Sequence, residues 1–478
     1  MTFGDDGWIG VAGEEITDAT VIRVVTAFLN HLRAVSPTGN QIKVAVAFDG
    51  RKDSRSFAEL SARILSGSGA SVLLCSAVVP SPVLSFITKD AGCAGGIMIT
   101  GRDYPSRYNG IKLRNAKGGP LTHIESKNIR TAVDGPEYPR TVPDSVPGRV
   151  EILDPMPRYL AHIKSMIDLS AIEVFARDPK NTASVLIDSM GGGGQTIIED
   201  ILVGCGWRAQ TLFGEAQPGF FDRSPETIFP NMAPLAYNVS VTDSQCGIAT
   251  NGDGSAIGLV SGRGDWITTQ ETMLALLFHM HDQRRQRGAI IKGATMSDKV
   301  NLLASTWNVP FKEVGLGSIG LSVSELKGEL LLGGEEGGRY LFPGHMAAAD
   351  AILSGLMVIE MISKATKPIQ AIIQSVRQKV GIAYCDQIEL PYKEIEPLEI
   401  FGLFSQRIGD LVSGQRIKQK VNIECGGQIE GVKLVFGESR WIAIRLSNIF
   451  PTVRITAEGS TQAELRSFLA AAKSLMPA

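Results

Sequence analysis

Apolar and polar positions follow two different periods along most of the chain. Residues 17–35 place apolar side chains every three or four positions, which predicts an amphipathic helix, whereas residues 42–48 form the nearly continuous apolar run of a buried strand. The same two periods continue in helices at 54–69 and 84–92 and in strands at 70–77 and 95–100. This order of strand, helix, strand, helix and strand indicates a parallel or mixed sheet covered by helices.

The pattern begins again twice after a proline-rich segment at residues 136–157. The second round contains a stretch at 246–262 that is predicted as one strand, and the third round begins near Asp265. Beyond about Pro391, short strands and a final helix predict a smaller unit. The predicted fold class is therefore α/β, with three similar mixed-sheet α/β/α domains and a smaller C-terminal α+β domain. The predicted domain boundaries are 1–150, 151–258, 259–385 and 386–478.

The charge and composition of the chain indicate which kinds of partner it binds. The 47 Lys and Arg residues nearly balance the 49 Asp and Glu residues, without a long block of one sign, so we expect no nucleic-acid partner and no membrane partner. No apolar run reaches roughly 18 residues and no leader is recognisable, so we expect a cytoplasmic protein. The six cysteines are scattered and lack the spacing of a zinc site. A small molecule is the expected partner, with a homo- or hetero-oligomer left open.

Three polar loops follow the carboxyl ends of predicted strands. They are FDGRKDS at 48–54, VVPSPV at 78–83 and TGRDYPSRYNG at 100–110. Ligands of open α/β sheets bind beyond the carboxyl ends of the strands, so these loops are predicted to form one functional rim.

The third of these loops carries a resemblance to a known family. The phosphoserine loop of the α-D-phosphohexomutases, which include phosphoglucomutases, phosphomannomutases and phosphoglucosamine mutases, usually reads T-A-S-H-N-P-x-x-Y-N-G. Thr100, Pro105, Tyr108, Asn109 and Gly110 match it. With further landmarks in the family's order, essentially the whole chain resembles this family.

The resemblance implies a fold, a reaction and a cofactor. The family has three similar α/β domains and a fourth domain around a central cleft. A phosphoserine in domain 1 exchanges a phosphoryl group with the sugar phosphate, and three aspartates in domain 2 hold Mg²⁺. Domain 3 reads the sugar hydroxyls, and domain 4 binds the phosphate that is not transferred. Catalysis of this kind consists of positioning and of neutralising charge on the phosphoryl oxygens.

Two landmarks depart from the family where its chemistry takes place. Arg102 stands at the phosphoserine position, and a guanidinium has no lone pair with which to accept a phosphoryl group. The family's metal loop D-G-D-x-D-R reads NGDGSA at 251–256, which leaves Asn251, Asp253 and Ser255 at the three ligand positions. Mg²⁺ prefers charged oxygen ligands, so we expect no cofactor, with Mg²⁺ binding improbable.

The two loops that bind substrate in the family match its motifs more closely than the phosphoserine loop and the metal loop do. The sugar-reading loop G-E-x-S-G retains Glu335 and Glu336, and the phosphate loop of domain 4 retains Arg445, Ser447 and Arg454. The resemblance implies that the glutamates bind sugar hydroxyls and that the arginines and the serine bind a phosphate.

Other positions leave alternatives open. Arg51 matches an arginine common near the family's active site and is counted among the substrate-binding residues. Arg102 either neutralises charge near Asp253 and holds a phosphate, or is an exposed loop arginine without a role. The family's G-F-K lysine is absent at 315–317, and Ile449 and Phe450 replace polar partners in the phosphate loop.

Three hypotheses about function follow. The first is a phosphohexomutase-like protein of carbohydrate metabolism without ordinary mutase activity, a pseudoenzyme that binds a sugar phosphate in a regulatory or partner role. The second is an active intramolecular phosphotransferase, or another sugar-phosphate enzyme, with a non-standard site that uses Asp103 or Ser106 as acceptor. The third is a purely structural or interaction protein.

Overall fold

The structure, a computed structural model, describes most of the chain. The described residues are 2–4, 7–37, 41–135, 148–315, 317–391, 408–409, 411–425, 428–447 and 452–475. They form two units, one of Met1–Thr269 with Gly337–Ile372 and one of Gln270–Glu336 with Ile373–Ala478. The fourfold division expected from the sequence stays a prediction.

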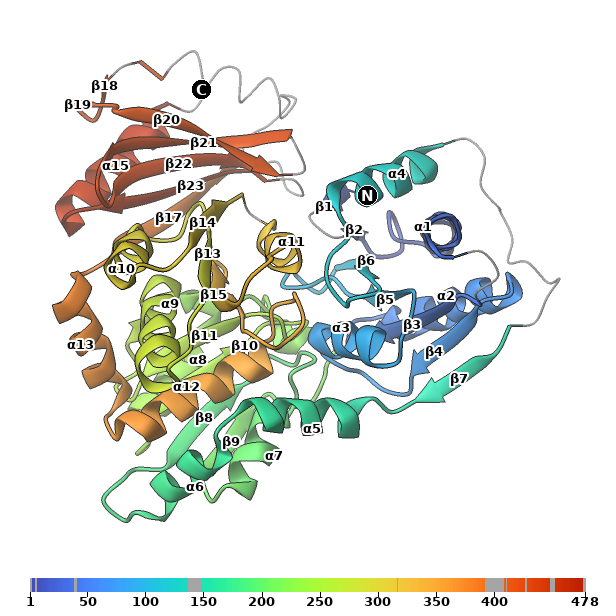
Figure 1. Ribbon diagram of the computed structural model, residues 1–478, viewed down its shortest axis with the longest axis horizontal. Helices are drawn as coiled ribbons and strands as arrows, with labels where there is room; N and C mark the ends of the chain where they lie inside the picture. The colour runs from blue at the N-terminus through green and yellow to red at the C-terminus, as the bar shows by residue number, and fades with distance from the viewer. Residues whose placement is uncertain are drawn as a thin grey trace. The chain divides into compact units, whose positions relative to one another are not determined.

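The first unit begins with a seven-stranded mixed sheet in the order β1-β2-β6-β5-β3-β4-β7 (Figure 1). Its strands are β1 (Thr2–Gly4), β2 (Gly7–Val11), β3 (Lys43–Phe48), β4 (Ser71–Cys75), β5 (Gly95–Ile99), β6 (Tyr108–Asn115) and β7 (Val150–Leu153). Strands β3, β4, β5 and β7 run parallel, whereas β2 and β6 pair antiparallel. The predicted strands at 42–48, 70–77 and 95–100 are therefore present, and the mixed α/β sheet is confirmed.

Four helices cover this sheet. They are α1 (Asp18–Val35), α2 (Ser54–Gly67), α3 (Ser81–Asp90) and α4 (His123–Asp134). Apolar side chains of α1, α2 and α4 join one buried cluster with the strands. Local signals start two of the helices, because the Thr17 hydroxyl accepts the N–H of Thr20 and because Thr122 and Glu125 form a capping box.

The register of β3 and β5 positions the functional rim. The two strands are parallel with Phe48 opposite Ile99, so the loops that follow them begin side by side. The N–H of Asp49 continues the ladder by donating to the Ile99 carbonyl over 3.0 Å. The loop after β3 is thereby placed against the loop that begins at Thr100.

A second sheet of the same unit has the order β12-β11-β10-β8-β9. Its strands are β8 (Ser184–Asp188), β9 (Arg208–Leu212), β10 (Cys246–Thr250), β11 (Ile257–Ser261) and β12 (Trp266–Ile267). The single strand predicted at 246–262 is wrong, since β10 and β11 form an antiparallel hairpin. Residues 251–256 turn between them, with Gly254 in a left-handed conformation at φ 68°.

Helices and short elements complete the first unit. They are α5 (Met156–Met166), α6 (Leu169–Arg177), α7 (Ile197–Gly204), η1 (Phe220–Asp222), α8 (Phe229–Ser240), β16 (Arg339–Leu341) and α12 (Ala351–Ala365). Asp350 caps α12 by accepting the N–H of Leu353, and it also accepts the Tyr159 hydroxyl over 2.8 Å. This bond links α12 to α5.

The second unit contains a parallel α/β part and an antiparallel part. The first has strands β13 (Ala289–Gly293), β14 (Phe311–Val314) and β15 (Leu330–Glu335), with α9 (Thr269–Phe278), η2 (His279–Gln283), α10 (Lys299–Trp307), α11 (Ile319–Ser324) and α13 (Ile369–Val380). The second has the order β17-β23-β22-β21-β20. Its elements are β17 (Tyr384–Pro391), β20 (Gln419–Cys425), β21 (Gln428–Gly437), β22 (Arg440–Leu446), β23 (Thr452–Gly459) and α15 (Gln462–Ser474), with a hairpin of β18 (Leu411–Val412) and β19 (Gln415–Arg416).

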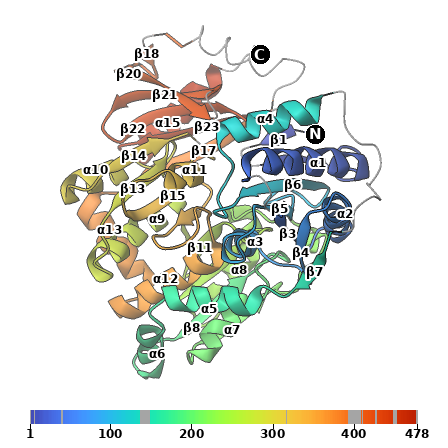
Figure 2. The same ribbon diagram turned by 45° about the vertical axis from the view of Figure 1, so that its right-hand side comes forward.

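The predicted smaller α+β part is therefore present, and α15 lies on one face of its sheet (Figure 2). A buried ion network joins the two parts of this unit. The Lys292 ammonium lies 3.0 Å from Asp298 and 3.1 Å from Glu313, and the Lys433 ammonium of β21 lies 3.2 Å from the same Glu313. Both lysines are buried, so their charges need these carboxylates.

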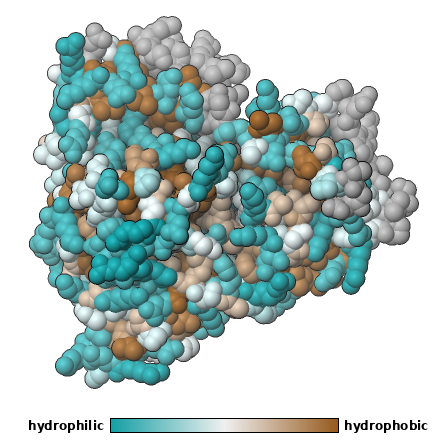
Figure 3. Space-filling view, viewed as in Figure 1, coloured by the Kyte–Doolittle hydropathy of each residue, from teal (hydrophilic) through white to brown (hydrophobic). Residues whose placement is uncertain are grey.

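The surface is mixed in character. On the face shown in Figure 3, apolar side chains are interspersed among polar ones. Within the described ranges, no helix is long and apolar enough to cross a membrane.

We expect the stability of the C-terminal part to depend on Glu464 in a pH-dependent way. Burial alone would raise the pKa of its carboxyl, but hydrogen bonds from Arg440, Ser460 and Gln415 outweigh burial and lower that pKa from 4.5 to about 2. A carboxylate with a lowered pKa stabilises the fold above its unfolded pKa, and this stabilisation is lost as the pH falls from 4.5 towards 2. Glu464→Gln should therefore lower the free energy of unfolding at pH 7 by about 2 kcal/mol.

Urea unfolding at neutral and acidic pH tests this. The difference between wild type and Glu464→Gln should shrink towards zero as the pH falls below 4.5. Glu59→Gln, which removes an exposed carboxylate paired with Arg55 on α2, is the matched control and should change little at either pH. A pH-independent difference for Glu464→Gln would contradict the expectation.

Candidate functional site

A buried arginine fixes the backbone of the loop that follows β5. Arg51 is 4% exposed and uses all five of its N–H donors. Nε donates to the Asp49 carboxylate over 3.2 Å, and the other four donors bind loop carbonyls. These carbonyls belong to Pro105 (2.9 Å) and Tyr108 (3.0 Å), bound by Nη1, and to Arg102 (2.9 Å) and Tyr104 (2.7 Å), bound by Nη2.

The Asp49 carboxylate anchors this arginine. Its side chain is 0% exposed and also accepts the Ser54 hydroxyl over 2.8 Å. Burial raises the pKa of Asp49, and the Arg51 charge opposes this shift. A side chain at Gly101 would lie 2.7 Å from Arg51 Cζ, so the loop passes the guanidinium closely enough to require glycine. Arg51, predicted as substrate-binding, is placed beneath the loop and holds its backbone.

Arg102 turns the loop so that two adjacent side chains have different surroundings. Its φ of 55° is left-handed, and its N–H donates to the Thr100 hydroxyl over 2.9 Å. Its Nη2 atom is buried, and the Arg102 charge contributes to lowering the pKa of both Lys112 and Arg114. Arg102 is therefore not an exposed loop arginine.

Asp103, the next residue, contacts a different cation. One of its carboxylate oxygens lies 2.5 Å from Nη2 of Arg339, the first residue of β16. Burial by itself would raise the pKa of Asp103, but the charges of Arg339 and Arg102 outweigh burial and lower it. The Asp103 side chain is 20% exposed, so an ionised carboxylate at this point of the loop remains accessible.

The loop between β10 and β11 is built around Asp253, which is 0% exposed. One carboxylate oxygen accepts the Ser81 hydroxyl over 2.7 Å and lies 3.2 Å from the Lys112 ammonium. The other accepts the Ser255 hydroxyl over 2.5 Å and the Asn251 amide over 3.1 Å. Both oxygens of the remaining carboxylate are thus engaged by protein donors.

The electrostatics of this cluster are dominated by burial and by cations. Burial would raise the pKa of Asp253, but Lys112 and the Ser255 hydroxyl hold it well below its usual range. Burial lowers the pKa of Lys112 to about 7, with Arg114 and Arg102 adding to the shift and Asp253 opposing it. Burial and Arg102 lower the pKa of Arg114 to about 9.

The loop between β10 and β11 holds the three positions that correspond to the family's magnesium ligands. Among the described residues, no group of three or more His, Cys, Asp or Glu side chains is placed to hold a metal. Asp253 is the one carboxylate at the three ligand positions, and the Lys112 ammonium lies against it. In this arrangement Asn251, Asp253 and Ser255 do not fit Mg²⁺, which requires charged oxygen ligands that are free to bind it.

The predicted recognition residues lie together in the second unit. The Glu336 carboxylate is 3.5 Å from Nη2 of Arg445 and 3.7 Å from Nη1 of Arg454, and it accepts the Thr456 hydroxyl over 3.4 Å. Glu335 ends β15 and accepts the N–H of Gly317 over 3.3 Å. A sugar-reading glutamate and two phosphate-binding arginines of the prediction are thus direct neighbours.

The other predicted positions are less informative. Ser447 follows β22, and its N–H donates to the Thr452 carbonyl over 2.9 Å. Ser106 lies exposed in the loop after β5. Ile449 and Phe450 lie outside the described residues, so the structure does not address the predictions made for them.

Sequence reasoning missed Lys112, Arg114 and Arg339, and it included Ser81 only as part of the rim loop at 78–83. Lys112 and Arg114 stand at alternate positions of β6, whose other residues are mostly apolar, and both are buried. Two cations on one face of a buried strand are a signal that carboxylates must lie opposite that face. Ser81 and Arg339 carry no comparable signal.

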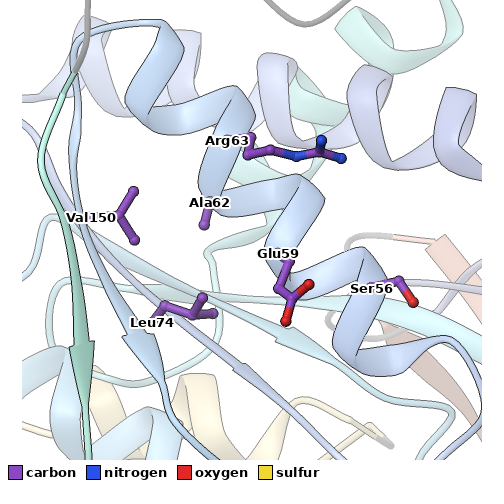
Figure 4. A pocket seen from close by; sticks show the side chains of 6 residues that line it. All are labelled: Ser56, Glu59, Ala62, Arg63, Leu74 and Val150. Carbon is purple, nitrogen blue, oxygen red and sulfur yellow. The ribbon is translucent and has the colours of Figure 1, made fainter.

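A separate pocket of about 380 Å³ is lined by side chains of α2, β4 and β7 (Figure 4). It is lined by Ser56, Glu59, Ala62, Arg63, Leu74 and Val150. None of the predicted site residues is among them, so we assign it no part in the site.

Comparison with known proteins identifies the class. Models described as "Phosphoglucomutase/phosphomannomutase, alpha/beta/alpha domain I" and "domain III" match residues 1–139 and 269–380. A "Probable phosphoglucosamine mutase" from Methanosphaera stadtmanae is 25% identical over 470 residues, which are 97% of this chain and 96% of that protein. A crystal structure from Thermus thermophilus that carries the name phosphomannomutase matches with a TM-score of 0.83 and 25% identity over 99% of both chains.

The chain belongs to the α-D-phosphohexomutase family. The prediction of a protein without mutase activity in a regulatory or partner role is contradicted, because relatives that match over nearly the whole chain are named as mutases. That prediction counted each replaced residue as a loss. The structure also shows charged groups that the motifs do not contain, since Lys112 and Arg339 form ion pairs with Asp253 and Asp103.

The expectation of no cofactor is also contradicted. The N-acetylphosphoglucosamine mutase of Aspergillus fumigatus, solved in complex with GlcNAc-6P and magnesium, shares the fold with a TM-score of 0.52 and 12% identity over 99% of this chain and 95% of that chain. A protein with this fold therefore binds a magnesium ion. The misfit seen at Asp253 concerns the arrangement of this loop alone.

We expect the whole loop after β5 to depend on Arg51. Arg51→Met leaves the buried Asp49 carboxylate unpaired and four carbonyls without their donors, which should lower the free energy of unfolding by about 3–5 kcal/mol. Urea unfolding measures this, and amide hydrogen exchange within residues 100–110 should accelerate.

Arg51→Lys is the matched control, because an ammonium retains the charge beside Asp49 but does not span four carbonyls. It should lie between wild type and Arg51→Met in stability, with exchange in the loop still accelerated. If Arg51→Met stayed within about 0.5 kcal/mol of wild type, the anchoring role would be refuted.

Proposed function

We propose that this protein is an active sugar-phosphate mutase that moves a phosphoryl group between two oxygens of one hexose or hexosamine. The observation that carries the proposal is the cluster of cations around the loop after β5. Four of them, Arg102, Lys112, Arg114 and Arg339, surround two carboxylates, those of Asp103 and Asp253. Lys112, whose pKa is about 7, is only partly charged at neutral pH, but the three arginines alone outnumber the two carboxylates, and a phosphate would balance the excess positive charge.

The physics of the reaction favours such a cluster. Phosphoryl transfer places negative charge on the non-bridging oxygens, and catalysis consists largely of positioning and of neutralising that charge. Guanidinium groups do both, because they are planar, charged at neutral pH and able to bind two oxygens at once. The relatives' names as phosphoglucosamine mutases support a hexosamine phosphate as substrate.

The second unit supplies the proposed recognition of substrate. Glu335 and Glu336 would bind sugar hydroxyls, and Arg445, Ser447 and Arg454 would bind the phosphate that is not transferred. Since the Glu336 carboxylate already lies near both arginines, an incoming phosphate competes with it. Phosphate binding would then release Glu336 for the sugar.

Turnover by the purified full-length chain tests the proposal. We expect conversion of glucosamine 6-phosphate, glucose 1-phosphate or mannose 1-phosphate to its positional isomer, with glucose 1,6-bisphosphate present as activator and with Mg²⁺ supplied in one series and chelated in another. Arg339→Gln, which removes a cation beside Asp103, should lower kcat by at least about tenfold. The absence of isomerisation of all three sugar phosphates in both series would rule out the mutase function.

Competition at the phosphate arginines gives a second prediction, with inorganic phosphate as the probe. Glu336→Gln removes the carboxylate that lies near both arginines, so the Kd for phosphate should fall by about fivefold, equivalent to about 1 kcal/mol. Isothermal titration measures it.

Glu389→Gln is the matched control. Glu389 also pairs with Arg454, but its side chain is 41% exposed and water screens the pair, so the change in Kd should be smaller. A Kd that rises in Glu336→Gln would refute the competition, and Arg454→Leu should weaken phosphate binding in either case.

A further inference from the structure

We propose that Asp103 is the phosphoryl acceptor of this enzyme and forms an acyl phosphate during turnover. The inference rests on the proposed function and names the group that performs its covalent step. The residue at the family's phosphoserine position, Arg102, is unable to accept a phosphoryl group. The acceptor is the next side chain along the same loop.

The backbone of Asp103 is held on both sides. The two carbonyls bound by Nη2 of Arg51 belong to Arg102 and Tyr104, the residues directly before and after Asp103. A nucleophile must be held close to its productive position, because small displacements lower the rate steeply. Arg51 provides this constraint from beneath the loop and leaves the Asp103 side chain free of it.

The surroundings of three aspartates show why Asp103 is the acceptor among them. Asp49 and Asp253 have side chains that are 0% exposed and are enclosed by protein donors. The Asp103 side chain is 20% exposed, and the Arg339 side chain that pairs with it is also partly exposed. A substrate phosphate therefore reaches Asp103 without dismantling a buried carboxylate site.

Asp103 is also in the protonation state that the reaction needs. Burial opposes ionisation, but the charges of Arg339 and Arg102 keep the pKa of Asp103 below the ordinary value, so it is a carboxylate at neutral pH. Ser106, the other acceptor predicted in this loop, carries a hydroxyl that must first lose a proton to a base. Asp103 requires no such base to begin the reaction.

The proposed step balances in atoms and charge. A carboxylate oxygen of Asp103 attacks one phosphorus of a hexose 1,6-bisphosphate, a new P–O bond to Asp103 forms, and the P–O bond to the sugar breaks. The leaving sugar oxygen takes a proton from water and becomes a hydroxyl. In the reverse direction a sugar hydroxyl attacks the acyl phosphate, gives its proton to water and releases the Asp103 carboxylate.

The neighbouring cations suit this step. As the phosphoryl group arrives, Nη2 of Arg339, which donates to Asp103 in the free enzyme, donates to an oxygen of the phosphoryl group instead. Arg102 contributes a second charge that already acts on Asp103. The excess positive charge of the cluster thus falls where negative charge develops.

The test uses the full-length chain and radiolabelled glucose 1,6-bisphosphate, quenched in acid. An acyl phosphate is cleaved by hydroxylamine, whereas a phosphoserine is not. Borohydride reduction of an aspartyl phosphate leaves homoserine, which peptide mass spectrometry locates by position. We expect label that hydroxylamine releases and homoserine at position 103.

Three variants sharpen the test. Asp103→Asn keeps the shape but removes the nucleophile and should lose the label and at least about a thousandfold in kcat. Asp103→Glu retains a carboxylate and should retain a hydroxylamine-sensitive label. Ser106→Ala is the matched control in the same loop and should keep both label and turnover. The reduction experiment on wild type does not depend on the folding of any variant.

The failure of this inference differs from the failure of the proposed function. Turnover with hydroxylamine-resistant label, with label on Ser106, or with undiminished kcat in Asp103→Asn overturns Asp103 as acceptor and leaves the mutase function standing. The absence of isomerisation by wild type overturns the mutase function itself. Homoserine at position 103 supports the inference.

Discussion

The buried ion pair between Asp49 and Arg51 is the interaction on which the rest of the site depends. The Asp49 carboxylate makes a buried guanidinium tolerable, and the guanidinium then has four donors left for the loop after β5. The register of β3 and β5 sets the loops that follow these strands side by side. Arg51, in the first loop, therefore holds the backbone of the second loop in place. The positions of Arg102 and Asp103 follow from it.

A second constraint is the balance of charge between the Asp253 carboxylate and the Lys112 ammonium. Asp253 retains one carboxylate where the family has three, and the buried ammonium of Lys112 lies against it. An uncompensated buried charge costs several kcal/mol, and here the buried Asp253 carboxylate and the buried Lys112 ammonium compensate each other. Hydrogen bonds from Ser81, Ser255 and Asn251 also engage both oxygens of this carboxylate, and they hold the loop around it.

The sequence allowed most elements of the fold and the frame of the site to be predicted, because both depend on local pattern. Apolar periods located β3, β4, β5 and α2, and the loops after the strands located the rim. The hairpin was missed although Asn251-Gly252-Asp253-Gly254 is a turn signal between two apolar runs, because the whole stretch was taken as one strand. Lys112 and Asp253 are 141 positions apart, and no local pattern pairs them. The function was misjudged because only the residues replaced in the motifs were counted, whereas relatives that match over nearly the whole chain are named as mutases.

The pairing of Asp103 with Arg339 has opposite effects on the two halves of a reversible transfer. A carboxylate whose pKa is lowered by cations is a weaker nucleophile, but it is also a better leaving group when the sugar hydroxyl takes the phosphoryl group back. An acyl phosphate is a high-energy species, so a mutase that uses one needs cations that stabilise the phosphoenzyme more than the free carboxylate. A transferred phosphoryl group carries more negative charge than the carboxylate it replaces, and Arg339 and Arg102 bind it correspondingly more strongly. The same cations that weaken the nucleophile thus bring the phosphoenzyme closer in energy to the free enzyme, as reversible transfer requires.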